Sequence, residues 1–167
     1  MGPQNNQDEN IPDTSTTTFT ALTPPTEATF FDGHWDGAVP WYGNTYMILE
    51  KASGRAITRT HGTICLRETE GPSDDNRWLC INSNNYFGFQ NPKSGQYMGH
   101  DGNYGLRASA ADVLPWERFT LKRHPDGGYQ LLVPHWWHSL RVVTTAEDGR
   151  SLVTRPHGTT LWEFVRV

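Results

Sequence analysis

Short runs of alternating apolar and polar residues recur from about residue 44 to residue 167, and glycine, proline or asparagine interrupts each run after a few positions. Such runs are typical of β-strands that bury one face, because successive side chains on a strand point to opposite sides. No segment keeps an apolar face at helical spacing for more than about two turns. The pattern therefore predicts an all-β protein built from many short strands.

These strands recur in a threefold order. Three stretches begin at a tyrosine, pass through a glycine turn and end at a tryptophan that opens another strand. They run from Tyr46 to Trp78, from Tyr86 to Trp116 and from Tyr129 to Trp162, with separations of 32, 30 and 33 residues. A propeller needs at least four blades, so three four-strand units predict a β-trefoil, a closed barrel with a hairpin cap. We expect the three tryptophans in its core and the strand ending at Val167 to close the barrel beside Tyr46.

The second unit carries three distinctive runs, at residues 94–102, 106–108 and 116–121, and the third keeps Asp148-Gly149 and 162–164. These runs resemble the fascin and actin-crosslinking branch of the β-trefoil proteins. The resemblance covers roughly residues 44–167. It implies the same fold and makes an actin or other cytoskeletal partner one possible function. The first unit departs from the pattern.

Composition divides the chain into two parts. Residues 1–28 are acidic and rich in Thr, Pro and Asn, which predicts an N-terminal arm that is disordered or extended along the body. Residues 29–167 form the expected β-trefoil domain. The first 50 residues carry seven acidic side chains and no Lys or Arg, whereas the remainder carries 14 basic and 11 acidic side chains. We therefore expect a weak attraction between arm and body that salt reduces.

Several partners and locations are disfavoured by the sequence. No basic stripe interleaves with aromatic residues, so we expect no nucleic acid. No apolar run matches a signal peptide or a membrane span, which predicts a cytoplasmic protein without membrane contact. The two cysteines, Cys65 and Cys80, favour free thiols in a reducing compartment, although one bridge remains possible. No phosphate-binding or dinucleotide motif occurs, so we expect no cofactor.

Residues outside the repeat are the candidates for function. Surplus tryptophans with neighbouring histidines suit a sugar ring or a small apolar molecule, because a flat ring next to polar groups matches both. The predicted ligand-binding residues are Trp35, Trp41, His135, Trp136, Trp137 and His138. Two tryptophans adjacent on a strand point to opposite sides, so at most one enters the core. The alternative is that the arm docks its tryptophans onto the other pair, and a protein surface is a further possible partner.

The histidines also raise the question of a metal. His34, His135 and His138 lie beside the surplus tryptophans, but no Cys pair or carboxylate completes a ligand set at diagnostic spacing. We therefore expect no metal site, with neutral imidazoles bonded to loop backbone instead.

A near-repeated hexapeptide supplies the candidates for catalysis. Residues 58–63 match residues 154–159 except at the third position, at places that are not equivalent in the threefold order. An Arg with a His two residues on can hold an anion beside a group that titrates near neutral pH. If the protein is an enzyme, this pattern assigns catalysis to His61, His157, Arg59 and Arg155. The simpler interpretation is a repeated turn, in which His-Gly-Thr closes a hairpin.

Three function classes follow. The preferred one is a ligand-binding β-trefoil module that recognises a glycan or an apolar small molecule through the non-repeated Trp and His residues. The alternative is a cofactor-independent isomerase or cyclase with a Trp-lined pocket and His acid–base groups, since such sites carry no sequence motif. The second alternative is an actin-binding protein, which the net charge of −4 mildly disfavours.

Overall fold

The computed structural model describes residues 2, 30–31, 34–35, 37–136 and 139–167. Its strands follow the three predicted units. The first unit contains β3 (Thr45–Glu50), β4 (Ala56–Thr60), β5 (Thr63–Arg67) and β6 (Trp78–Ser83). The second contains β7 (Tyr86–Gln90), β8 (Tyr97–His100), β9 (Leu106–Ala110), the 3₁₀ turn η1 (Pro115–Glu117) and β10 (Thr120–Arg123). The third contains β11 (Tyr129–His135), β12 (Ser139–Thr145), β13 (Leu152–Arg155) and β14 (Trp162–Arg166).

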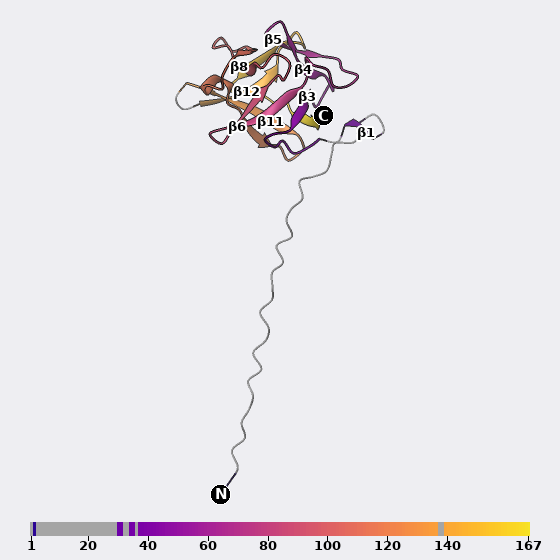
Figure 1. Cartoon of the computed structure of the whole chain (residues 1–167), viewed down its shortest axis with the longest axis vertical. Helices are drawn as coiled ribbons and strands as arrows, with labels where there is room; N and C mark the ends of the chain where they lie inside the picture. Colours follow the sequence, from indigo (N-terminus) through magenta and orange to yellow (C-terminus); the bar gives the residue numbers. More distant parts are fainter. Residues whose placement is uncertain (1, 3–29, 32–33, 36, 137–138) are drawn as a thin grey trace.

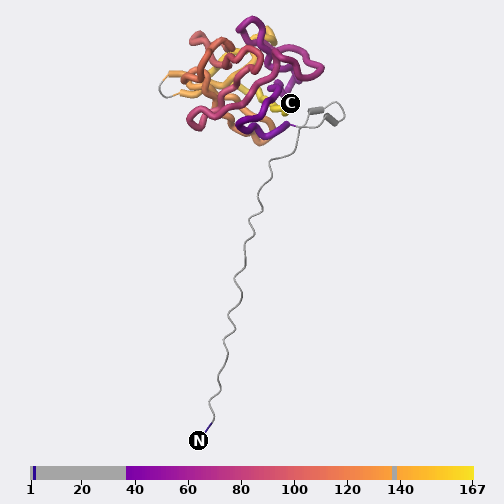
Figure 2. The backbone as a smooth tube through the Cα atoms, viewed as in Figure 1, coloured from indigo at the N-terminus to yellow at the C-terminus, as the bar shows by residue number. Residues whose placement is uncertain are grey.

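The first and last strand of each unit form a closed barrel. β14 pairs with β3, β3 with β6, β6 with β7, β10 with β11, and β11 with β14. A single bridge between Phe87 and Phe119 joins β7 to β10 and completes the ring. The C-terminal strand lies beside β3, at the start of the domain (Figures 1 and 2). The all-β class, the β-trefoil and the predicted closure by the last strand near Tyr46 are confirmed.

The two middle strands of each unit pair with each other as hairpins and cover one end of the barrel. The three hairpins also touch one another, through the pairs Thr63–Arg107, Cys65–Ser151 and Gly105–Val153. This contact buries strands that would otherwise expose unpaired edges.

The core is a cluster of rings and aliphatic side chains contributed by all three units. Phe164 packs against Tyr46 with ring centroids 5.7 Å apart and against Phe89 at 5.8 Å. Trp78 and Trp162 are completely buried and donate their indole N–H groups to the carbonyls of Ile57 and Val143. Their predicted core positions are therefore confirmed.

The prediction for Trp116 is wrong. This ring is 46% exposed and lies on η1 rather than on a strand. The equivalent strand pairs are Tyr46–Trp78, Phe87–Phe119 and Tyr129–Trp162, so the buried Phe119 occupies the core position of the second unit. A phenylalanine fills the same apolar space, and the nearby tryptophan is free to lie outside the core.

The N-terminal side of the domain includes a two-residue pairing of β1 (Phe30–Phe31) with β2 (His34–Trp35). The predicted arm, residues 1–28, falls outside the described residues except for Gly2. In the described part of the chain, no helix has the length and apolar character that crossing a bilayer requires.

Candidate functional site

A pocket of about 690 Å³ opens where the second and third units meet. Residues 100–103 contribute the end of β8 and the turn that follows it. Pro115 and Trp116 contribute η1, and residues 134–136 contribute the end of β11. Most of this lining is carbon, with a few polar groups on one side. This combination is typical of sites for small molecules and sugars.

The position of η1 places the Trp116 ring in this pocket. Its anchor is the buried carboxyl of Glu117, which accepts a hydrogen bond from the backbone N–H of Leu114 at 3.2 Å. Arg107 lies 3.8 Å from the same carboxyl and 5.9 Å from the centre of the Trp116 ring. Burial raises the pKa of Glu117, while the Leu114 N–H and Arg107 oppose that shift.

Two glycines make room for this arrangement. A Cβ on Gly99 would lie 2.7 Å from the Trp116 carbonyl oxygen, so η1 can approach β8 this closely only over a glycine. A Cβ on Gly102 would lie 3.1 Å from the Trp116 ring, which therefore rests on the following turn.

His100 forms the buried wall of the pocket and is only 5% exposed. Its ring lies beside Trp116, with ring centroids 4.8 Å apart. Burial lowers the pKa of His100 and the neighbouring His135 lowers it further, against the opposing effects of Asp101 and the Pro134 carbonyl. The imidazole is therefore neutral at pH 7.

The hydrogen bonding of His100 defines its tautomer. Nδ1 accepts a hydrogen bond from the Gly102 backbone N–H at 3.2 Å, so the proton lies on Nε2. Nε2 is buried and has no partner of hydrogen-bond geometry among the described residues. The nearby Pro134 carbonyl still acts on the ring, because it raises the pKa of His100 and so opposes the effect of burial. A buried donor without a partner is uncommon in a folded protein.

Trp136 is the most exposed aromatic residue among those that line the pocket. Trp136 is 81% exposed and follows the last residue of β11 with a backbone φ of 52°. A bulky side chain rarely adopts this left-handed conformation, because the Cβ crowds the backbone. Its ring meets the His135 ring edge to face at 6.0 Å, and His135 in turn lies 5.5 Å from Tyr104. Trp136 is thus held out over the opening rather than folded into the core.

Polar groups lie along one side of the same opening. Asp101 Oδ1 accepts hydrogen bonds from the backbone N–H groups of Asn103 (2.7 Å) and Gly105 (2.9 Å), which fix the carboxylate in place. Within the described residues, no hydrogen bond involves Oδ2 or the side-chain amide of Asn103. Asp101 and Asn103 are both exposed residues that line the pocket, and their side chains can bond hydroxyl groups.

At the equivalent positions of the two other junctions, hydrogen bonds join the units directly. Between the first and second units, the buried Asn91 donates to the Asp74 carbonyl at 2.7 Å. Between the third and first, Thr145 donates to the buried Glu50, and the Lys51 N–H donates to Leu161 at 2.8 Å. The aromatic pocket therefore lies at the junction where the threefold symmetry is broken, as the surplus aromatic residues led us to expect.

The predicted ligand-binding residues fall in different places. His135 and Trp136 line the aromatic pocket. Trp41 is 62% exposed, packs against Tyr42 and is not among the residues of that pocket. Trp137, His138 and the side chain of Trp35 lie outside the described residues, as does the side chain of His34.

The hexapeptide residues lie in two unlike settings. His61 and Gly62 have φ values of 51° and 87° and form the two-residue turn between β4 and β5. Arg59 donates from Nε to the Ala108 carbonyl at 3.1 Å and from Nη2 to Gln96, which ties β4 to the second unit. These contacts match the turn interpretation of the first copy.

The second copy follows a different path. Arg155 ends β13, and His157 is exposed in the loop before β14. Gly158 packs against Thr144, where a Cβ would overlap the side chain. None of the four residues predicted for catalysis is among those lining the aromatic pocket.

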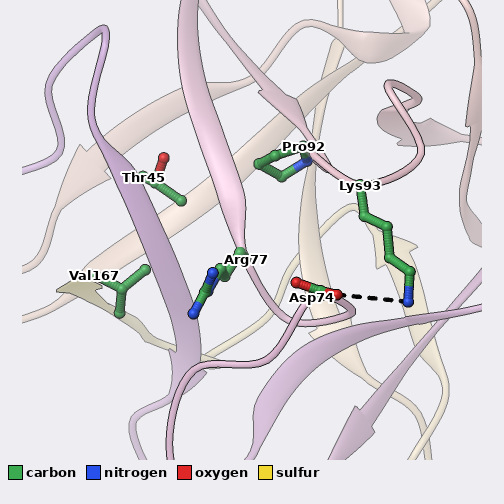
Figure 3. A pocket seen from close by; sticks show the side chains of 6 residues that line it. All are labelled: Thr45, Asp74, Arg77, Pro92, Lys93 and Val167. Carbon is green, nitrogen blue, oxygen red and sulfur yellow. Dashed lines mark ion pairs between the residues drawn. The ribbon is translucent and has the colours of Figure 1, made fainter.

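Another hollow, of about 600 Å³, lies between the start of β3, the loop before β6, the turn after β7 and Val167 (Figure 3). Its charged side chains are Arg77, Lys93 and Asp74, and the last two form an ion pair of 3.7 Å. Its internal ion pair, and a smaller share of apolar surface than in the aromatic pocket, make it the less suitable site for a small molecule.

Neither cysteine lines the aromatic pocket. Cys65 and Cys80 are both free, and burial raises the pKa of the Cys80 thiol to about 12, far from a reactive thiolate. Within the described ranges, no group of three or more His, Cys, Asp or Glu side chains is placed to hold a metal ion.

The sequence interpretation overlooked Trp116, His100 and Asp101 as site residues. It assigned all three to the repeating framework, because they belong to runs that the family resemblance explains. The available signal was the separation of 30 residues in the second unit against 32 and 33 in the others, which showed Trp116 to be out of register.

The sequence matches no protein-family model and no curated protein. Solved structures do match. A ricin B-like lectin from Macrolepiota procera, in complex with lactose, is 16% identical with a TM-score of 0.66, over 78% of this chain and all of that one. The designed threefold-symmetric protein ThreeFoil is 15% identical with a TM-score of 0.63, over 74% of this chain and 99% of that one.

A third match is a GlcNAcα1-4Gal-releasing endo-β-galactosidase from Clostridium perfringens, 14% identical with a TM-score of 0.63. The match covers 74% of this chain but only 32% of the galactosidase chain, so the likeness concerns one part of that enzyme. At these identities the likenesses establish the fold and leave the fascin resemblance a prediction. The chain has the β-trefoil fold.

Proposed function

We propose that the protein is a carbohydrate-binding β-trefoil module whose binding site is the aromatic pocket between the second and third units. The observation that supports this most is that two exposed tryptophans, Trp116 and Trp136, and the carboxylate residue Asp101 line the same opening. Sugar rings present an apolar C–H face and a rim of hydroxyl groups. Aromatic rings pack against the C–H face, and carboxylate and amide groups form hydrogen bonds with the hydroxyl groups.

The structural likenesses support the same class of ligand. The Macrolepiota procera lectin has this fold and is in complex with lactose, and the Clostridium perfringens protein, matched over 32% of its chain, is a GlcNAcα1-4Gal-releasing endo-β-galactosidase. The residues of the proposed site are taken from this structure and not from the relatives: they belong to β8, η1 and β11 and the turns beside them.

The test is binding to a glycan array, followed by titration calorimetry with the best glycan. We expect one site per chain, because the equivalent segments at the other two junctions carry no tryptophan and hydrogen bonds join the units there. Trp116→Ala and Trp136→Ala should each weaken binding by about tenfold or more, the equivalent of about 1.4 kcal/mol. Both rings are exposed, so the thermal unfolding midpoint should change little.

Trp41→Ala is the matched control, since it removes an exposed indole that does not line the pocket. Unchanged binding in this variant together with loss in the other two would support the proposal. Absence of binding to any glycan, or equal losses in all three variants, would contradict it.

An enzyme acting on the bound sugar is the second candidate, and His100 is the observation that favours it. Its imidazole carries the proton on Nε2, which has no partner of hydrogen-bond geometry among the described residues, and the ring centroids of His100 and His135 are 6.3 Å apart. Such a pair can give and take a proton.

Mass spectrometry of the bound glycan over time separates the two functions. An enzyme would convert the glycan, and His100→Gln would retain binding while abolishing conversion. A pure binding module would return the glycan unchanged.

A further inference from the structure

The Trp116 ring separates the aromatic pocket from a second hollow. This hollow measures about 560 Å³ and shares Pro115 and Trp116 with the first. Ala110, Ala111 and Leu114 extend it away from the polar rim. One continuous surface therefore leads from the carboxylate of Asp101 across an indole to an apolar recess.

The second hollow offers little to a sugar. Its buried carboxyl, Glu117, is already engaged by the Leu114 N–H and lies close to Arg107. The remaining charged group, Asp112, is exposed and disfavours an anionic occupant. Leu114 is 63% exposed, so an apolar occupant would remove a large aliphatic side chain from water.

We propose that the ligand is a glycoside with an apolar aglycone. This proposal rests on the proposed function. The sugar occupies the aromatic pocket, beside Asp101 and Trp136, and the aglycone crosses Trp116 and covers Leu114. The two halves of the ligand match the two halves of the surface, because Asp101 and Asn103 line the first hollow and the apolar side chains of Ala110, Ala111 and Leu114 line the second.

Alkyl glycosides provide the test. Methyl and hexyl β-glycosides of glucose, galactose and N-acetylglucosamine are titrated into the full chain below the micellar concentration, with tryptophan fluorescence as the readout. Each fully buried methylene is worth about fourfold in affinity. In an open hollow, we expect the hexyl compound to bind roughly tenfold or more tightly than the methyl compound of the same sugar.

Leu114→Ser isolates the aglycone contact, and Leu140→Ser is its control because Leu140 is also exposed but lines neither hollow. Leu114→Ser should remove most of the hexyl advantage and leave the affinity for the methyl glycoside unchanged. Leu140→Ser should leave the affinities for both glycosides unchanged.

The remaining outcomes overturn one proposal or the other. Equal affinity of methyl and hexyl glycosides overturns the aglycone site and leaves the sugar site standing. A hexyl advantage that survives in Leu114→Ser also overturns the aglycone site. Binding of hexanol as tight as that of the hexyl glycosides, or no binding of any glycoside, overturns the carbohydrate function itself.

Discussion

At the scale of single residues, the exposed side chains of the pocket are held by backbone and buried partners rather than by their own packing. Trp136 sits in a left-handed conformation, Trp116 depends on the buried Glu117, and Asp101 is fixed by two backbone N–H groups. Strain at a residue with no core role is an indication of function, because nothing in the fold itself requires it.

Trp136 gives the test at this scale. Trp136→Gly and Trp136→Ala both remove the ring, but only glycine relieves the left-handed conformation. We expect the glycine variant to exceed the alanine variant by about 0.5–1 kcal/mol in free energy of unfolding, with glycan binding weakened in both. Urea denaturation measures the difference. Equal stability of the two variants would mean that the turn is not strained.

At the scale of elements, η1 distinguishes the second unit from the other two, because it places the Trp116 ring in the aromatic pocket. The equivalent segments before β6 and β14 carry no tryptophan. At those two junctions hydrogen bonds join the adjacent units, from Asn91 to Asp74 and from Thr145 to Glu50. Close contact between η1 and β8 is what directs Trp116 outward, and that contact depends on the missing side chain of Gly99.

Gly99→Ala tests this dependence. The added Cβ would lie 2.7 Å from the Trp116 carbonyl and 2.8 Å from Glu117 Oε1, so η1 must move. We expect a loss of about 1–3 kcal/mol in stability and weaker glycan binding, as for other overpacked sites. Gly37→Ala is the control, since its nearest neighbour would be 3.9 Å from the new Cβ. Unchanged binding in Gly99→Ala would show that η1 does not position the site.

At the scale of the whole molecule, the barrel depends on its last strand. β14 pairs with β3 over five residues and contributes the buried Trp162, Phe164 and Val165. Because a barrel has no free edges, removal of one strand exposes two others.

Deletion of residues 162–167 is therefore expected to abolish cooperative unfolding, as followed by circular dichroism during heating. Arg166→Ala keeps the buried residues of β14 and should unfold cooperatively, near the temperature of the unchanged chain. A truncated protein with a sharp transition would contradict the closed barrel.

The alternation of apolar and polar residues, and its threefold recurrence, were sufficient to predict the fold. Both depend on local chemistry, since strand faces and glycine turns are properties of short segments. The burial of Trp78 and Trp162 followed from the same recurrence. The sequence also directed attention to His135 and Trp136, because they have no counterpart in the other units.

The location of the pocket could be decided only in the folded chain. Trp116 and Trp136 are 20 positions apart in the sequence, and no local pattern distinguishes an indole that fills a core from one that lines a pocket. That choice depended on which ring of the second unit entered the barrel. Phe119 did so, because its position on the strand matches Trp78 and Trp162, and Trp116 was left at the surface beside β11.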